Sequence, residues 1–90
     1  MREATLTLTN ELGLHARAAA ELIKLTGKFE STITLCREDT NVTADAGSLL
    51  DILYLAAAKG VSVKVTADGR DEEVAIEQIE KLFADKFGED

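Results

Sequence analysis

The stretch VSVKVTADG, residues 61–69, carries the clearest strand pattern in the chain. Apolar side chains occupy every second position of it: Val61, Val63, Val65 and Ala67. Successive residues of a strand point to opposite faces of a sheet, so this pattern predicts one face on a core and the other in water. The Asp68-Gly69 pair that follows is a turn signal and ends the strand.

Three other segments alternate in the same way and predict three further strands. Residues 4–9 (ATLTLT) form the first, and its alanine and leucines should face inward. Residues 31–36 (STITLC) and 41–44 (NVTA) form the others, and the short polar link between them predicts a hairpin. Cys36 is out of phase with the apolar residues of its strand, so we expect it on the open face of the sheet.

The segment at residues 16–26 changes to helical spacing. Four apolar residues would share the buried face of this helix: Ala16, Ala19, Ala20 and Ile23. Gly27 is the predicted stop, because glycine is favoured just after the last helical turn.

Two later segments also predict helices. The first begins near Ser48 and stops at Gly60, and Ser48 with Asp51 three residues later matches a capping box. The second runs from about Arg70 to Phe87. Its apolar stripe is expected to hold Ala75, Ile79, Leu82 and Phe83.

The order of these elements is βαββαβα. Strands with one face in water favour a four-stranded, mostly antiparallel sheet whose three helices cover one face, which is an α/β (α+β) two-layer open-faced sandwich. Ninety residues are enough for one such domain, spanning residues 1–90. Periodicity leaves the strand order open, since a ferredoxin-like arrangement would give the same pattern.

Composition narrows the classes of function. The chain is 46% hydrophobic and 30% charged, and it has neither an apolar run of the roughly 18 residues that cross a membrane nor a signal-peptide pattern, so we expect a cytoplasmic protein without membrane insertion. One cysteine and one histidine cannot build a zinc tetrad or an internal disulfide. The net charge of −7 argues against nucleic acid as a partner.

The single histidine, His15, lies where the helix at residues 16–26 begins, and the net acidity lies elsewhere: residues 68–90 hold nine acids and three bases. Backbone N–H groups at a helix N-terminus are unpaired and carry about half a positive charge, which attracts anions. Arg17 is a cation at the end of a helix where cations are unfavourable. An imidazole nucleophile with these donors suits a phosphoryl group bound by Ala16, Arg17 and Ala18. A surface histidine without chemistry, in an acidic interaction domain, is the alternative.

The segment GLHARAAAELIK resembles the active-site segment of the HPr family, the histidine phosphocarriers of the bacterial phosphoenolpyruvate-dependent phosphotransferase system. The resemblance extends along the whole chain. It implies a sheet of four antiparallel strands under three helices, and a carrier, not an enzyme in the usual sense, that needs no cofactor. His15 would accept a phosphoryl group on Nδ1 from enzyme I and pass it to an enzyme IIA protein or domain, and Arg17 would stabilise that group. Both the sugar-uptake and the nitrogen-related branch remain open.

The sequence departs from the family pattern after the arginine, where Ala18 replaces the usual proline. This change restores an N–H donor and relaxes the backbone, so the transfer rate is in question. Ser48 aligns with a serine that a kinase/phosphorylase modifies in some branches of the family. Its other role is that of a helix N-cap. A regulatory binding module, controlled by phosphorylation at Ser48 or His15, is therefore the alternative function.

The resemblance also implies a docking surface for partners. Ala20, Leu49 and Leu50 would contact enzyme I and enzyme IIA, whereas Leu53 is expected in the core, since three apolar residues in five cannot all face outward on a helix. We expect the carrier to be a monomer.

Overall fold

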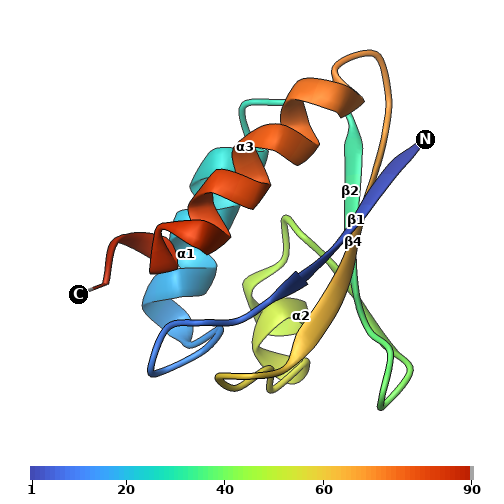
Figure 1. Cartoon of the computed structure of the whole chain (residues 1–90). Coiled ribbons are helices and arrows are strands. Elements are labelled where there is room, and N and C mark those ends of the chain that lie inside the picture. The colour runs from blue at the N-terminus through green and yellow to red at the C-terminus, as the bar shows by residue number, and fades with distance from the viewer. Residues whose placement is uncertain (90) are drawn as a thin grey trace.

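The computed structural model describes residues 1–89. Four strands, three α-helices and one 3₁₀ helix follow one another along the chain (Figure 1). They are β1 (Arg2–Thr7), α1 (Ala16–Thr26), β2 (Thr32–Arg37), β3 (Val42–Asp45), α2 (Leu49–Tyr54), β4 (Ser62–Asp68), α3 (Glu72–Ala84) and η1 (Lys86–Gly88). The predicted order βαββαβα is confirmed.

The sheet has the strand order β1-β4-β2-β3, and every neighbouring pair is antiparallel. Leu6 of β1 and Leu35 of β2 lie opposite Val63 and Val65 of β4, respectively. All three α-helices cover one face of this sheet, as Figure 1 shows. The predicted two-layer open-faced sandwich is therefore confirmed, and the strand order that periodicity left open is fixed by β4 pairing with both β1 and β2.

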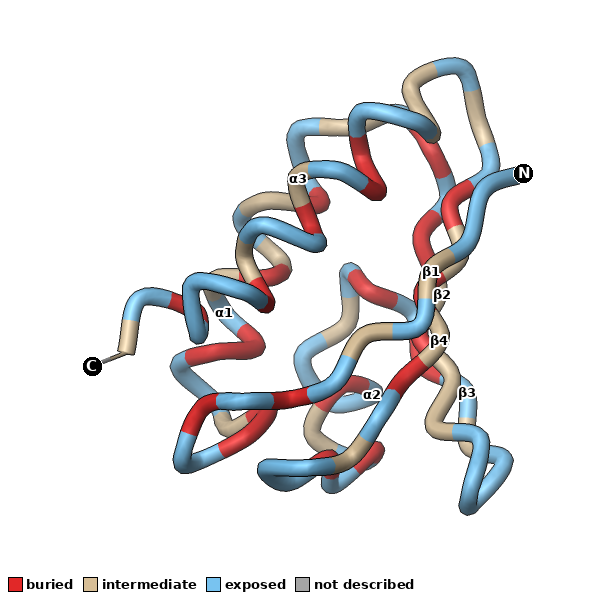
Figure 2. The backbone as a smooth tube through the Cα atoms, viewed as in Figure 1, coloured by how far each residue is buried: buried red, intermediate tan, exposed pale blue. Residues whose placement is uncertain are grey.

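The position of β4 explains why its sequence pattern is so regular. It is an inner strand with a neighbour on each side, and its inward residues Val63, Val65 and Ala67 are fully buried. The buried residues of the sheet and of the helices face one another across the space between the two layers (Figure 2). Cys36 is half-buried on β2 and pairs with Lys64.

The buried face of α1 differs from the prediction. Ala18, Ala19, Leu22 and Thr26 are buried, whereas Ala16 and Ala20 are exposed. Apolar residues occupy so many positions of this helix that several faces satisfied helical spacing, and the large side chain of Leu22 decides between them. The stop at Gly27 is confirmed: its N–H donates to the carbonyl of Ile23 at 2.9 Å.

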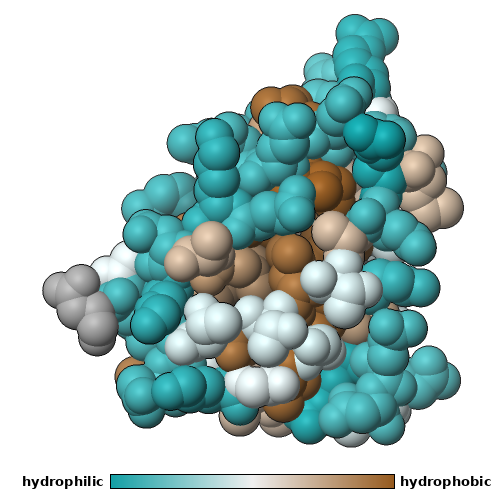
Figure 3. Space-filling model, viewed as in Figure 1, coloured by the Kyte–Doolittle hydropathy of each residue, from teal (hydrophilic) through white to brown (hydrophobic). Residues whose placement is uncertain are grey.

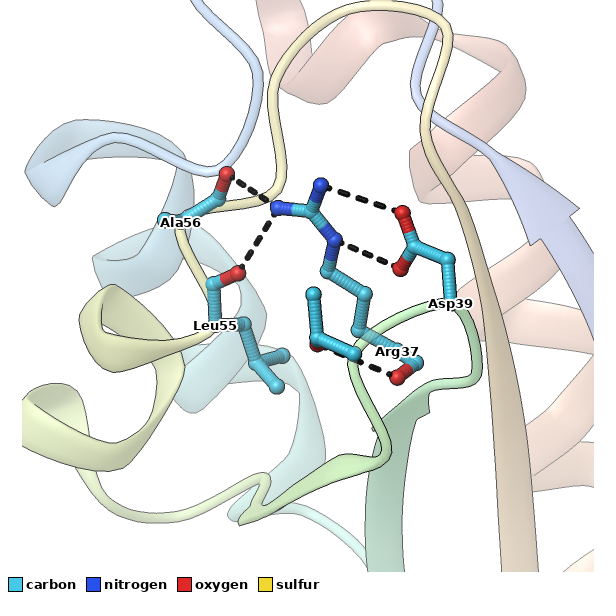
Figure 4. Close-up of polar contacts among 5 residues, drawn as sticks. Arg37, Asp39, Leu55 and Ala56 are labelled. Carbon is cyan, nitrogen blue, oxygen red and sulfur yellow. Dashed lines mark hydrogen bonds and ion pairs between the residues drawn. The ribbon is translucent and has the colours of Figure 1, made fainter.

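Helix α2 ends at Tyr54, so the prediction that it continues to Gly60 was wrong. Ala56 has a φ of 51°, which a right-handed helix cannot contain. Arg37 holds this end of the helix, because its Nη1 donates to the carbonyl oxygens of Leu55 at 3.1 Å and Ala56 at 2.7 Å (Figure 4). Asp39 accepts from the same guanidinium at 2.8 and 3.2 Å.

Helix α3 is also shorter than predicted, running from Glu72 to Ala84 in place of residues 70–87. The predicted stripe is buried at Ala75, Ile79 and Phe83 and half-buried at Leu82. Beyond the helix, Phe87 turns back in the left-handed region and is buried, with its ring centroid 4.9 Å from that of Phe83. The 3₁₀ helix η1, which contains Phe87, contacts both α3 and α1.

No charged residue among residues 1–89 is buried. Hydrophilic residues cover most of the face seen in Figure 3, around a strip of hydrophobic side chains at its centre. Within residues 1–89, no helix combines the length and the apolar character needed to span a membrane.

Candidate functional site

His15 is the N-cap residue of α1, as the sequence indicates, and the loop before it is held by the chain after α2. The N–H of Leu14 donates to the carbonyl of Ala57 at 2.9 Å, and the N–H of His15 donates to the carbonyl of Gly13 at 2.9 Å. Gly13 has a φ of +62°, a conformation that glycine adopts without steric cost. These contacts fix the backbone of His15 at the start of the helix.

The first backbone donors of α1 are available to a ligand. The first hydrogen bond to a cap carbonyl runs from Ala19 to His15 at 2.8 Å, so the N–H groups of Ala16, Arg17 and Ala18 precede the ladder. No side chain caps them, and the first turn has no acid. The side chain of Ala18 is buried, so only its N–H group could meet a ligand. Within residues 1–89, this end of α1 therefore offers three unpaired donors.

Arg17 is exposed on the first turn of α1, one residue before the buried Ala18. In the described part of the chain its guanidinium forms no ion pair, unlike Arg37, which is bound by Asp39. A guanidinium carried on the same helical turn as these N–H groups can bind the oxygens of a phosphoryl group by charge-assisted hydrogen bonds. Sequence reasoning placed the same residues together.

Glu89 is the functional neighbour of His15 that sequence reasoning missed. Its Oε2 lies 2.5 Å from Nε2 of His15, and it also accepts a hydrogen bond at 2.9 Å from Nδ2 of Asn10. The side chains of His15 and Glu89 are 25% and 19% exposed, so the contact is partly shielded from water. Hydrogen bonds from His15, and then from Asn10, lower the pKa of Glu89 below its usual value.

Asn10 ties this contact to the loop. It is buried, and its Nδ2 donates both to Glu89 and, at 2.8 Å, to the carbonyl of Gly13. No sequence signal pointed to these partners, because Glu89 is 74 positions from His15. Within residues 1–89, Nδ1 of His15 makes no hydrogen bond, so the ring presents one engaged and one free nitrogen.

Ser48 is the N-cap of α2, and its Oγ accepts a hydrogen bond at 3.3 Å from the N–H of Asp51. The carboxylate of Asp51 accepts from the N–H of Asp45 at 3.2 Å, so the capping box lacks the expected reciprocal bond to Ser48. The Ser48 hydroxyl thus has a structural role. Its phosphorylation stays a prediction.

The predicted docking residues are on the surface. Ala20 is exposed on α1, and Leu49 and Leu50 are 42% and 80% exposed on α2. Leu53 is half-buried and packs against the core, in line with the prediction. Tyr54, which the sequence did not single out, adds an exposed aromatic ring to α2. Exposed apolar side chains of this size suit a protein contact.

Among residues 1–89, no group of three or more His, Cys, Asp or Glu side chains could hold a metal ion. The groups around His15 are backbone amides, a guanidinium, an imidazole and a carboxylate. These groups can bind an anion and carry out nucleophilic transfer at nitrogen.

Comparison with known proteins shows which family the chain resembles. Residues 2–85 match the family model described as the PTS HPr component phosphorylation site. The chain is 42% identical over 90 residues to phosphocarrier protein HPr of Xylella fastidiosa (strain Temecula1 / ATCC 700964), covering 100% of this chain and 99% of that protein. It is 40% identical over 86 residues to phosphocarrier protein NPr of Escherichia coli (strain K12), covering 96% and 94%.

A solved structure gives the same result. The crystal structure of HPr-C-His from Thermoanaerobacter tengcongensis superimposes with a TM-score of 0.94 at 39% identity, and the match covers 100% of this chain and 99% of that one. The family model and these relatives span nearly every residue, and the solved structure has the same fold as this chain. The chain therefore belongs to the HPr family of phosphocarrier proteins of the phosphotransferase system.

Proposed function

We propose that His15 accepts a phosphoryl group on Nδ1 from phosphorylated enzyme I and donates it to a histidine of an enzyme IIA protein or domain. The observation that carries this proposal is that, among residues 1–89, Nδ1 of the N-cap imidazole makes no hydrogen bond and the three N–H groups that follow it in the chain are unpaired. The carrier is phosphorylated and dephosphorylated in each cycle, so it works as a shuttle. It works in the cytoplasm.

The chemistry is an in-line transfer between two nitrogens. The lone pair on Nδ1 attacks phosphorus, a bond from Nδ1 to phosphorus forms, and the imidazole of the donor leaves with its electron pair. The transferring group is anionic, and Arg17 with the N–H groups of Ala16 and Ala18 would compensate its charge. Because the two bonds exchanged are alike, the site contributes mainly position and charge complementarity.

Partner proteins would dock on the surface that includes Ala20, Leu49 and Leu50. Leu50 is the most exposed of the three, and its burial against a partner would remove apolar area from water. We propose that enzyme I and enzyme IIA use this surface in turn, since both must present a phosphorylatable histidine to the same Nδ1.

The test is a phosphorylation assay with the whole chain. The protein is incubated with enzyme I and phosphoenolpyruvate, and its intact mass is measured. We expect a gain of one phosphoryl group that is acid-labile and base-stable, because a phosphoramidate bond is formed. His15→Ala should lose the gain, and Ser48→Ala, the matched control at the N-cap of α2, should keep it. A gain that survives in His15→Ala would refute the proposal.

The enzyme IIA that accepts the phosphoryl group distinguishes the sugar-uptake branch from the nitrogen-related branch. The phosphorylated chain is mixed separately with an enzyme IIA of sugar uptake and with one of the nitrogen-related relay, and loss of the phosphoryl mass is followed over time. The acceptor that discharges the chain faster identifies the branch. Discharge by neither acceptor would contradict the donating half of the proposal.

A further inference from the structure

We propose that Glu89 is a positioning residue for the transfer at His15: it holds the ring with its proton on Nε2 and compensates the charge of the phosphorylated ring. This inference rests on the proposed function and adds a residue and a role to it. The geometry behind it is the single Glu89 oxygen shared by His15 and Asn10.

Glu89 is held in place from two sides. On the backbone side, Phe87, two residues earlier in the chain, is buried against Phe83, and the N–H of Glu89 donates to the carbonyl of Lys86 at 3.0 Å, closing a turn. On the side-chain side, Asn10, which is 1% exposed and lies in the loop that precedes His15, donates to Oε2 of Glu89. A buried amide and an aromatic contact thus fix a carboxylate that would otherwise rotate freely at the surface.

The donors and acceptors of this contact determine the tautomer. A carboxylate is only an acceptor when ionised, and its hydrogen bonds keep the pKa of Glu89 low, so it is ionised at neutral pH. Nε2 must therefore donate. In a neutral imidazole that leaves the lone pair on Nδ1, the nitrogen with no other hydrogen bond in the described chain.

The Glu89 carboxylate stays next to the His15 ring while the charge of the ring changes during one cycle of transfer. When the Nδ1 lone pair forms its bond to phosphorus, Nε2 keeps its proton and the ring becomes cationic, next to the Glu89 carboxylate. When the acceptor takes the phosphoryl group, the bond between Nδ1 and phosphorus breaks and its electron pair returns to the ring. The ring leaves neutral with its proton still on Nε2, so no proton has to move in either direction. In other sites a carboxylate orients a histidine by accepting a hydrogen bond from its ring, and Glu89 acts on His15 in the same way.

A purely structural role is the competing interpretation, in which the contact only anchors the last turn of the chain. Two variants separate the roles of Glu89. Glu89→Ala removes the acceptor, and Glu89→Gln keeps an oxygen for Nε2 and Asn10 but removes the charge. Glu80→Gln is the matched control, because Glu80 is exposed on α3 and makes no ion pair or side-chain hydrogen bond among residues 1–89.

The experiment first measures the tautomer in the unphosphorylated protein by long-range ¹H–¹⁵N NMR of the His15 ring at neutral pH. We expect the proton on Nε2 in the wild type, in Glu89→Gln and in Glu80→Gln, and a mixture of tautomers in Glu89→Ala. An anchoring role alone would leave the ring tautomer unchanged in Glu89→Ala, and that result would overturn the proposal.

The second readout is phosphoryl transfer from enzyme I, with the fold of each variant checked by circular dichroism. We expect Glu89→Ala to slow uptake on the order of tenfold. Glu89→Gln should slow it less, and Glu80→Gln should match the wild type. Rates for both Glu89 variants equal to the control would overturn the inference. Absence of uptake by the wild type would instead refute the proposed function, and the tautomer measurement would still test the role of Glu89.

Discussion

A Cβ atom on Gly13 would lie 2.3 Å from the carbonyl oxygen of Ala57, the same oxygen that accepts the hydrogen bond from Leu14. The segment after α2 therefore sets the path of the loop that ends at His15. We predict that Gly13→Ala lowers the free energy of unfolding by at least about 1–2 kcal/mol, because φ is positive there and the new methyl group displaces the loop. Urea unfolding measures this loss, and phosphoryl uptake should fall with it.

Gly60→Ala is the control for this prediction. Gly60 also has a positive φ, +92°, but a Cβ atom there would meet nothing within 4 Å. Gly60→Ala should lose some stability through backbone strain alone, without a steric clash, and should leave phosphoryl uptake unchanged. Equal losses of stability and of uptake in both variants would show that the approach of Gly13 to Ala57 has no special role.

Arg17→Ala should separate stability from function. Removing a cation from the first turn of α1 is expected to raise the free energy of unfolding by about 0.3–1 kcal/mol, because the positive end of the helix dipole repels it. Phosphoryl transfer should slow on the order of tenfold or more, since a hydrogen bond to a charged group is lost. Lys24→Ala, in the last turn, is the control and should destabilise slightly without slowing transfer. An unchanged rate in Arg17→Ala would remove Arg17 from the site.

The docking surface can be tested at two neighbouring positions of α2. Leu50 is 80% exposed, so Leu50→Ser should change stability by no more than about 0.5 kcal/mol while raising the KM for enzyme I. Ile52 is fully buried, and Ile52→Ala should cost about 2–5 kcal/mol of stability. A KM that does not change in Leu50→Ser would place the docking surface elsewhere.

Asp71 makes the stability of the chain depend on pH. Its carboxylate accepts hydrogen bonds from the Ser31 hydroxyl at 2.5 Å, from the Ser31 N–H at 3.0 Å and from the Glu30 N–H at 2.8 Å. These bonds lower its pKa below the ordinary value of 3.8. Asp71 therefore binds its proton more tightly in the unfolded chain than in the folded one. The stability that its carboxylate contributes is complete above pH 3.8 and is lost as the pH falls through the folded-state pKa of Asp71.

Asp71→Asn should therefore be less stable than the wild type at pH 7, and the difference should shrink as the pH is lowered below about 4. Chemical unfolding across this range measures both curves. Glu77→Gln, an exposed change on α3, should run parallel to the wild type throughout. A difference between Asp71→Asn and wild type that stays constant with pH would contradict the assignment.

The strands were predictable because alternation in this chain reflects burial directly. On β4 each inward residue is fully buried, so period two is unbroken from Val63 to Ala67. The face of α1 was not predictable in the same way, since its alanines are small enough to lie on either side. Residues 56–58 are alanines that favour a helix in sequence, yet the contacts of Arg37 with Leu55 and Ala56 end α2 before them.

The residues of the site also differ in whether local sequence patterns could predict them. His15 and Arg17 were predictable because both lie within one short segment whose local rules are broken by a cation at a helix N-terminus. Glu89 and Asn10 could not be found from local rules, because their contact with each other spans 79 positions and depends on how Phe87 packs. Only the folded chain brings the carboxylate to the ring.

The decisive measurement is the identity of the ring nitrogen that carries the phosphoryl group. The chain is labelled with ¹⁵N, phosphorylated by enzyme I and phosphoenolpyruvate, and examined by ³¹P and ¹⁵N NMR. We expect coupling of phosphorus to Nδ1 of His15, with the proton of the ring on Nε2 beside Glu89. A phosphoryl group on Nε2, or on a residue other than His15, would contradict this expectation.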